Sequence, residues 1–196
     1  DDRPLLLTAD HCLGGWANNN IKHDAITNPA LNHWSFYWHY ERPGCPNTGS
    51  PPLLSTSGAT VVANNGATDF ALLELTEDPA DKNGVTPYYL GWDRSGNPGT
   101  GGVGIHHPSG DAKKISTYTI TPRSTNYLSS TTNSSGSYWR VTWAATTVDH
   151  HGVTEGGSSG SSLINSNFRV IGQLRGGTSS CTLKNDPDWY GKFSLS

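Results

Sequence analysis

Short apolar runs separated by turn-forming residues follow one another along the whole chain. Runs of this kind, bounded by Gly, Pro, Asn and Ser, are typical of β-strands. No window of about twelve residues has the apolar spacing of an amphipathic helix. The segment 139–145 (WRVTWAA) alternates between apolar and polar residues, as a half-buried strand does. The strands that the pattern predicts are residues 35–40, 60–63, 70–75, 88–92, 103–106, 114–121, 139–145 and 169–174.

Many short strands at near-regular spacing indicate an all-β fold, built as a sandwich or a barrel. The stretch 129–137 is rich in Ser and Thr, and strand signals resume directly after it. We therefore interpret it as a long hairpin loop and not as a linker. A length of 196 residues is enough to bury a core in one large domain or two small ones.

The charge balance and the cysteine count restrict the partners and the compartment. Only 15% of the residues are charged and the formal net charge is -3, which argues against nucleic acid or an anionic membrane surface as a partner. No apolar run approaches the roughly 20 residues of a membrane helix. Cys12, Cys45 and Cys181 in a Gly- and Ser-rich chain favour a secreted protein with disulfides. Because their number is odd, either one thiol is free or partners lie outside this chain.

Paired histidines and abundant tryptophans suggest other kinds of site. His106-His107 and His150-His151 could be read as metal ligands, but neighbours on a strand point to opposite faces, so we favour core or loop histidines and expect no metal or cofactor. The seven tryptophans fit core packing. A carbohydrate-binding β-domain would use Trp and Tyr on one face, and it remains an alternative that leaves the polar motifs below unexplained.

Hydroxyl groups crowd between glycines in the segment 154–163 (TEGGSSGSSL). A tight loop of this composition can present a Ser nucleophile while backbone N–H groups converge on a developing oxyanion. The same composition also fits a plain Gly/Ser surface loop. The segment alone does not decide between them.

Two further residues strengthen the hypothesis that this loop presents a Ser nucleophile. His11, in TADHC, could take the proton of a Ser hydroxyl at neutral pH. Asp69 opens the apolar run FALLEL, where a carboxylate is costly unless it is hydrogen-bonded, as it would be when it orients an imidazole. Taken alone, Asp69 could equally cap a strand. The chain order His11, Asp69, Ser159 is the chymotrypsin-type order and differs from those of subtilisin and the α/β-hydrolases.

The chain resembles the chymotrypsin-fold serine proteases, and most closely the bacterial lysyl endopeptidases. The matching stretches are spread in order over nearly the whole chain, and they are LLTADHC, SFYWHYERPGCPNT, TDFALLEL, GWDR, GIHHPSGDAKKIS, GVTEGGSSGSS, GQLRGGTSSC and DPDWYGKFS. The resemblance implies two antiparallel six-stranded β-barrels of trypsin-like type, the first of them incomplete. They would comprise residues 1–84, with the His and Asp, and residues 85–196, with the Ser and the specificity pocket.

The resemblance assigns roles residue by residue. His11 would be the general base, Asp69 its orienting carboxylate and Ser159 the nucleophile, with the N–H groups of Gly157 and Ser159 as the oxyanion hole. Ser158 occupies the place where animal trypsin-like enzymes carry an Asp that binds the freed N-terminus. The activation switch built on that Asp is therefore expected to be absent.

Substrate specificity is expected to reside in the last part of the chain. Trypsin carries an Asp six residues before its Ser, where this chain has Val153. The lysyl endopeptidases carry theirs in a segment similar to DPDWYGKF, which aligns Asp188 with it and implies Lys at P1. Without the resemblance, Asp188 could be part of an acidic surface turn.

Residues Arg175, Gly176 and Gly177 are expected to bind extended substrate through their backbone as an added strand. Arg175 stands where the lysyl endopeptidases carry a His near the catalytic imidazole. A cation there could lower the pKa of His11. Alternatively, Arg175 points outward and selects acidic residues beside P1.

The resemblance also predicts the cysteine partners, the function and the location of the protein. Cys12, Cys45 and Cys181 are expected to pair with cysteines in a preceding segment that this chain lacks, and the alternative is a Cys45–Cys181 disulfide with Cys12 free. The predicted function is a secreted, monomeric, cofactor-free serine endopeptidase that acts on polypeptides after Lys through an acyl-enzyme. Its rivals are a protease of the same fold with another P1 preference, such as Glu, and an inactive protease-like binding protein.

Overall fold

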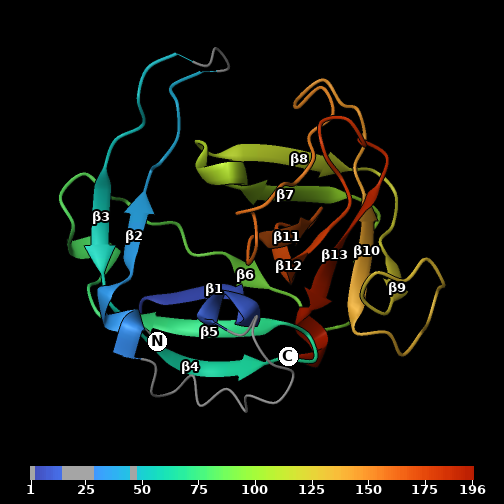
Figure 1. Ribbon diagram of the computed structural model, residues 1–196, viewed down its shortest axis with the longest axis horizontal. Helices are drawn as coiled ribbons and strands as arrows, with labels where there is room; N and C mark the ends of the chain where they lie inside the picture. Colours follow the sequence, from blue (N-terminus) through green and yellow to red (C-terminus); the bar gives the residue numbers. More distant parts are fainter. Residues whose placement is uncertain (1–2, 15–28, 45–47) are drawn as a thin grey trace.

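The computed structural model describes residues 3–14, 29–44 and 48–196. In this part of the chain every regular element is a β-strand or a short 3-10 helix, so the all-β prediction is confirmed (Figure 1). The strands are β1 (Leu5–Ala9), β2 (Ser35–Trp38), β3 (Leu54–Ser57), β4 (Ala59–Asn65), β5 (Phe70–Leu75), β6 (Gly91–Trp92), β7 (Gly102–His106), β8 (Lys114–Tyr118), β9 (Arg123–Thr125), β10 (Tyr138–Thr142), β11 (Ser162–Asn165), β12 (Arg169–Gly177) and β13 (Pro187–Lys192). The 3-10 helices are η1 (Asp10–Leu13), η3 (Pro29–His33), η4 (Pro79–Asp81), η5 (Pro108–Gly110) and η6 (Phe193–Leu195).

The first five strands form two small sheets. One has the order β1-β5-β4 and is antiparallel throughout, and the other is the antiparallel pair β2-β3. The apolar run of β5 lies in the middle of the three-stranded sheet, where Ala71, Leu73 and Leu75 are buried. They form a core with Leu13, Leu31, Ala59 and Val61, against which Trp34, Phe36 and Trp38 pack.

The remaining strands form one sheet of eight strands with the order β8-β7-β11-β12-β13-β10-β9, and β6 pairs with β12 in parallel. The loop between β9 and β10 contains residues 129–137, as the hairpin interpretation predicts. The core of the eight-stranded sheet consists of Tyr118, Trp139, Val141, Trp143, Val153, Leu163, Ile171, Leu174 and Tyr190. The described strands pair in three sheets, and the closure of each group into a six-stranded barrel stays a prediction.

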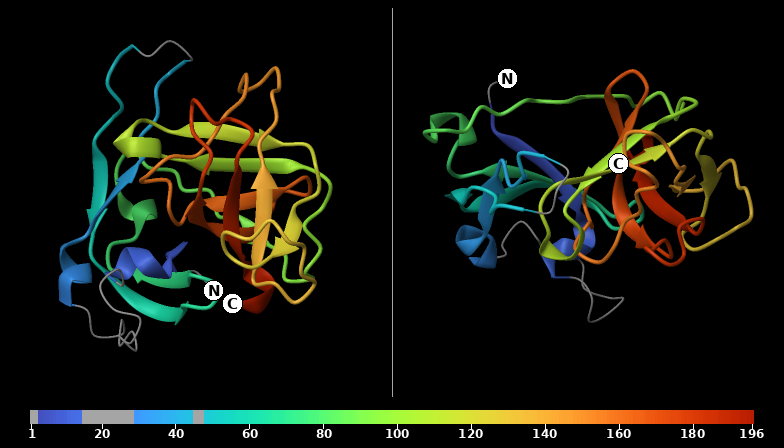
Figure 2. Two further views of the ribbon diagram at one scale, coloured as in Figure 1. Left: turned by 45° about the vertical axis from the view of Figure 1, so that its right-hand side comes forward. Right: turned by 90° about the horizontal axis from the view of Figure 1, so that it is seen from above.

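The two groups of strands meet where β1 contacts β12, and Figure 2 shows the two groups side by side. Gln173, fully buried on β12, donates a hydrogen bond from Nε2 to the backbone oxygen of Thr68 at 2.8 Å. The rings of Phe70 and Phe193 stack edge to face with centroids 5.7 Å apart. These contacts hold the start of β5 against β12 and η6. The boundary near residue 84 stays a prediction.

The cysteine predictions are only partly within reach of the structure. Cys12 is half-buried and Cys181 is exposed, and both are free thiols. Cys45 lies outside the described residues, so the predicted pairings stay predictions. In the part of the chain that the structure describes, no helix is long and apolar enough to cross a membrane. The same residues hold no group of three or more His, Cys, Asp or Glu side chains arranged for a metal ion.

Candidate active site

Strand pairing brings His11 and Asp69 together. In the antiparallel pair β1-β5, Ala9 lies opposite Phe70. Because His11 follows Ala9 by two residues and Asp69 directly precedes Phe70, this register brings His11 and Asp69 close together. His11 Nδ1 lies 2.6 Å from Asp69 Oδ2, and the backbone N–H of His11 donates to Asp69 Oδ1 at 2.8 Å. The carboxylate therefore fixes both the ring and the backbone of the same histidine.

The buried position of Asp69 is explained by these two hydrogen bonds. Asp69 is 2% exposed, and its backbone has a left-handed φ of 57°, which is uncommon for a residue other than Gly. The hydrogen bond between Nδ1 and the Asp69 carboxylate raises the pKa of His11 to about 9, with a smaller contribution from a hydrogen bond to Cys12. Asp69 therefore stabilises the imidazolium, as an orienting carboxylate must.

The loop with the Ser residues lies against the turn that carries His11. Gly160 donates its N–H to the backbone oxygen of Leu174 at 2.8 Å. A Cβ at Gly160 would stand 2.4 Å from Thr8 Oγ1 and 2.8 Å from the backbone N of Ala9, so only Gly fits there. This close approach places Ser159, the preceding residue, beside the end of β1 that leads into His11.

Burial separates the two neighbouring hydroxyls of the loop. Ser158 is 1% exposed, and its Oγ lies 2.9 Å from His106 Nδ1. Ser159 is half-buried. A buried hydroxyl held inside the fold cannot reach a substrate carbonyl, so Ser159 is the candidate nucleophile of this pair.

Backbone N–H groups around Ser159 can donate hydrogen bonds to a negatively charged oxygen. Ser158 N–H donates to Glu155 O at 3.0 Å and Gly160 N–H donates to Leu174 O. Across residues 3–14, 29–44 and 48–196, by contrast, the N–H groups of Gly157 and Ser159 donate to no protein acceptor. Unpaired amides on either side of Ser158 have the character of an oxyanion hole.

Asp188 lies in β13, 1% exposed, and is not part of a surface turn. Its Oδ2 accepts hydrogen bonds from Trp143 Nε1 at 2.6 Å, from Thr154 Oγ1 at 2.7 Å and from Ser179 Oγ at 2.7 Å. Its Oδ1 accepts only the backbone N–H of Ser179, at 3.3 Å, within the described residues. A Cβ at Gly177 would stand 1.9 Å from Oδ1, so a glycine is required beside the carboxylate.

Arg175 is half-buried between two tyrosines. Its guanidinium carbon lies 4.3 Å from the centroid of the Tyr127 ring, and its Nη1 donates to Tyr138 Oη at 2.9 Å. The pKa of His11 is shifted by Asp69, Cys12 and burial, and the effect of Arg175 on it stays a prediction.

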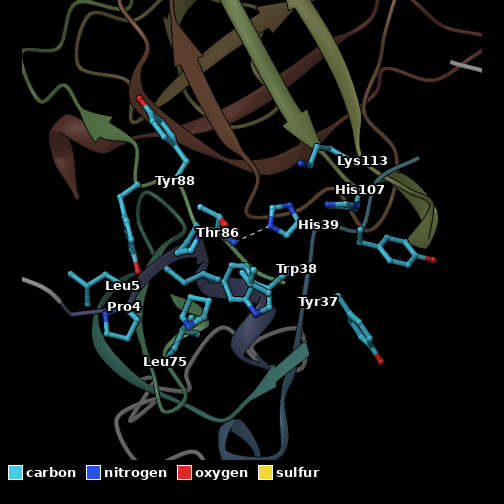
Figure 3. Close-up of a pocket in the computed structure, with 16 residues that line it drawn as sticks. Pro4, Leu5, Tyr37, Trp38, His39, Leu75, Thr86, Tyr88, His107 and Lys113 are labelled. Carbon is cyan, nitrogen blue, oxygen red and sulfur yellow. Dashed lines mark hydrogen bonds between the residues drawn. The ribbon is translucent and has the colours of Figure 1, made fainter. Parts of the chain in front are cut away.

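A pocket of about 420 Å³ lies elsewhere, between β2 and residues 85–89. Figure 3 shows Tyr37, Trp38, Leu75 and Tyr88 along its wall, with His39 Nε2 accepting the backbone N–H of Thr86 at 3.2 Å. None of His11, Asp69, Ser159 and Asp188 lines it. It is therefore distinct from the candidate active site.

The residues that support the site have no supporting role assigned from the sequence. Trp143, Thr154 and Ser179 hold Asp188, and His106 holds Ser158. For the three residues that bond Asp188, the only local signal in the sequence is Thr154, at the start of the Gly/Ser loop. His106 was noted as one of a pair, and the structure gives its ring two hydroxyl partners.

Comparisons with known proteins identify the family of the chain. A sequence model described as "Lysyl endopeptidase, C-terminal domain" matches residues 1–191. The chain belongs to this lysyl endopeptidase family. It is 31% identical over 205 residues to the lysyl endopeptidase of Pseudomonas aeruginosa (strain PAO1), a match that covers 98% of this chain. The chain spans 38% of the length of that relative.

Solved structures confirm the trypsin-like fold of this family member. Two structures of the HtrA-type protease AlgW, one with a decapeptide and one with a tripeptide, superpose on the whole chain with TM-scores of 0.54 and 0.55. Their sequence identities to this chain are 16% and 15%, and the chain covers 46% and 50% of their lengths. At this identity the likeness concerns the fold.

Proposed function

We propose that this chain is the catalytic unit of a secreted serine endopeptidase that cleaves polypeptides on the carboxyl side of Lys. The observation that carries the proposal is the bidentate hold of Asp69 on His11, at 2.6 Å and 2.8 Å, beside the loop that presents Ser159. Membership of the lysyl endopeptidase family supports the same activity.

The reaction follows from the positions of these groups. Ser159 Oγ attacks the peptide carbonyl carbon while His11 Nε2 takes the hydroxyl proton, and the N–H groups of Gly157 and Ser159 stabilise the oxyanion. His11 then gives the proton to the leaving amine, which departs as the acyl-enzyme forms. Water, activated by His11, hydrolyses the ester and regenerates Ser159.

Residues Arg175–Gly177 would pair with the substrate backbone. β11 begins at Ser162, opposite Gln173, so from Leu174 onward this edge of β12 carries no described strand. An extended peptide added there would run beside Ser159, because Gly160 is already bonded to Leu174. The cation of Arg175, stacked on Tyr127, would lie next to the residues before P1.

Asp188 would bind the ammonium group of a P1 Lys. Three donors already occupy Oδ2, whereas Oδ1 has one long hydrogen bond and the capacity for an ammonium donor. Without a cation, a buried carboxylate is only partly compensated, so neutral P1 side chains are disfavoured.

A serine-directed fluorophosphonate tests the activity. The full-length protein is expected to be labelled on Ser159, as located by peptide mass spectrometry, and His11→Ala is expected to abolish the label because the hydroxyl loses its base. Absence of label and of peptide hydrolysis in the unmodified protein would favour a protease-like binding protein instead.

Cleavage-site profiling tests the specificity. Asp188→Asn is expected to lower kcat/KM for a P1 Lys substrate by about 10²- to 10³-fold, because the ammonium loses its buried counter-charge. Asp186→Asn is the matched control, since Asp186 lies two residues earlier outside the buried core, and it should change little. A P1 Glu preference of the unmodified protein, or equal effects of both variants, would contradict the assignment.

A further inference from the structure

A second Ser–His contact lies inside the fold. His106, at the end of β7, is 2% exposed, and its ring bridges two hydroxyls. Nδ1 lies 2.9 Å from Ser158 Oγ, and Nε2 lies 3.0 Å from Ser116 Oγ. Because Ser158 and Ser116 are both buried as well, this arrangement cannot meet a substrate.

The hydrogen bonds fix the protons of this network. Ser116 donates its hydroxyl proton to Val153 O at 3.0 Å, so its oxygen accepts from His106 Nε2–H. A neutral ring with its proton on Nε2 has a bare Nδ1, which accepts the hydroxyl proton of Ser158. The Ser158 oxygen in turn accepts the N–H of Glu155 at 3.4 Å. Burial lowers the pKa of His106 to about 4, in keeping with the neutral ring.

The segment that carries His106 also contacts the loop through a backbone hydrogen bond. Directly after His107, the turn η5 brings Ser109, whose N–H donates to Gly156 O at 2.7 Å. Residues 155–158 are thus bonded both at the buried hydroxyl of Ser158 and at a backbone oxygen two residues earlier. The amides of Gly157 and Ser159 flank the residue that His106 binds.

We infer that neutral His106, through the hydroxyl of Ser158, is a positioning residue that sets the backbone of the nucleophile loop for transition-state stabilisation. This inference rests on the proposed function. Ser158 is the only side chain of residues 156–160 bonded to the interior of the larger sheet, so rotation of the Gly157 and Ser159 amides is limited through it. A displacement of about 1 Å in such donors can cost about 10²-fold in rate.

Two substitutions at one position separate positioning from simple stability. The amide oxygen of His106→Asn can stand near the place of Nδ1 and accept from Ser158, whereas the amide of His106→Gln can reach Ser116 but leaves Ser158 without an acceptor. Both lose one buried hydrogen bond and part of the ring. We expect kcat to fall about 10²-fold in the Gln variant and less than tenfold in the Asn variant, with KM within about threefold in both.

The measurements are kcat, KM and the thermal unfolding midpoint of the full-length protein and its variants, with Ser158→Ala as a third variant. Ser158→Ala is expected to lower kcat as much as the Gln variant does, because it removes the same hydrogen bond between Ser158 and His106 while the His106 ring stays in place. A kcat that follows the unfolding midpoint, or that is equal in the Asn and Gln variants, would overturn the inference while the unmodified protein stays active. If the unmodified protein neither hydrolyses peptides nor reacts at Ser159, the proposed function itself fails, and the inference falls with it.

Discussion

Replacing Ser159 by Ala is expected to lower kcat for a peptide substrate by about 10⁶-fold and to leave KM within about threefold. The reason is that the hydroxyl forms the covalent bond of the acyl-enzyme, whereas substrate binding rests on β12 and Asp188. The residual rate would come from the oxyanion hole and from binding alone. The loop stays anchored in this variant, since Gly160 and Ser158 keep their hydrogen bonds.

Ser161→Ala is the matched control, because it removes a hydroxyl from the same loop two residues later. Ser161 contributes its backbone to the loop, accepting from Leu174 N–H at 2.8 Å. Its kcat is therefore expected to stay within about tenfold of the unmodified protein. A large loss in Ser161→Ala together with a small loss in Ser159→Ala, measured with a Lys peptide amide, would move the nucleophile to the other hydroxyl.

The strands predicted from the sequence were those with aromatic or β-branched residues in clear runs. β5 was predicted over the residues observed, and β2, β7 and β12 within a few residues. β1, β3, β9, β11 and β13 were not predicted. β3 and β9 are short and rich in Ser or Thr, and β13 contains a Pro and a Gly. Such segments become strands through pairing with a partner, as β13 does between β10 and β12. Propensity alone does not carry that information.

For the site, the sequence supplied the residues and the structure supplied their environment. His11 and Asp69 were predicted to act together, and the register of β1 and β5 brings them into contact. Asp188 could be assigned only through resemblance, because its burial depends on Trp143, Thr154 and Ser179 from three separate segments. Contacts between residues so far apart in the chain leave no mark in local composition, and the same holds for His106 and Ser158.

Asp69→Asn is expected to lower kcat by about 10⁴-fold near neutral pH. Asp69 Oδ1 accepts the backbone N–H of His11, so the amide oxygen of Asn would take that place and leave its NH₂ facing Nδ1. A donor opposite Nδ1 forces the ring proton onto Nε2, and Nε2 can then no longer accept the proton of Ser159. The geometry is retained, but the imidazole is in the wrong tautomer.

The pH profile of kcat/KM measures the same interaction independently. His11 acts as a base only when deprotonated, so activity should rise with pH up to the pKa of about 9 that Asp69 supports. In Asp69→Asn the main cause of that raised pKa is lost, and the limb should move down toward the ordinary value of 6.5. Asp10→Asn is the control, because this buried carboxylate lies next to His11 in sequence and accepts from Asn64. A limb that moves in the Asp10 variant but not in the Asp69 variant would mean that Asp69 is not the carboxylate that governs His11.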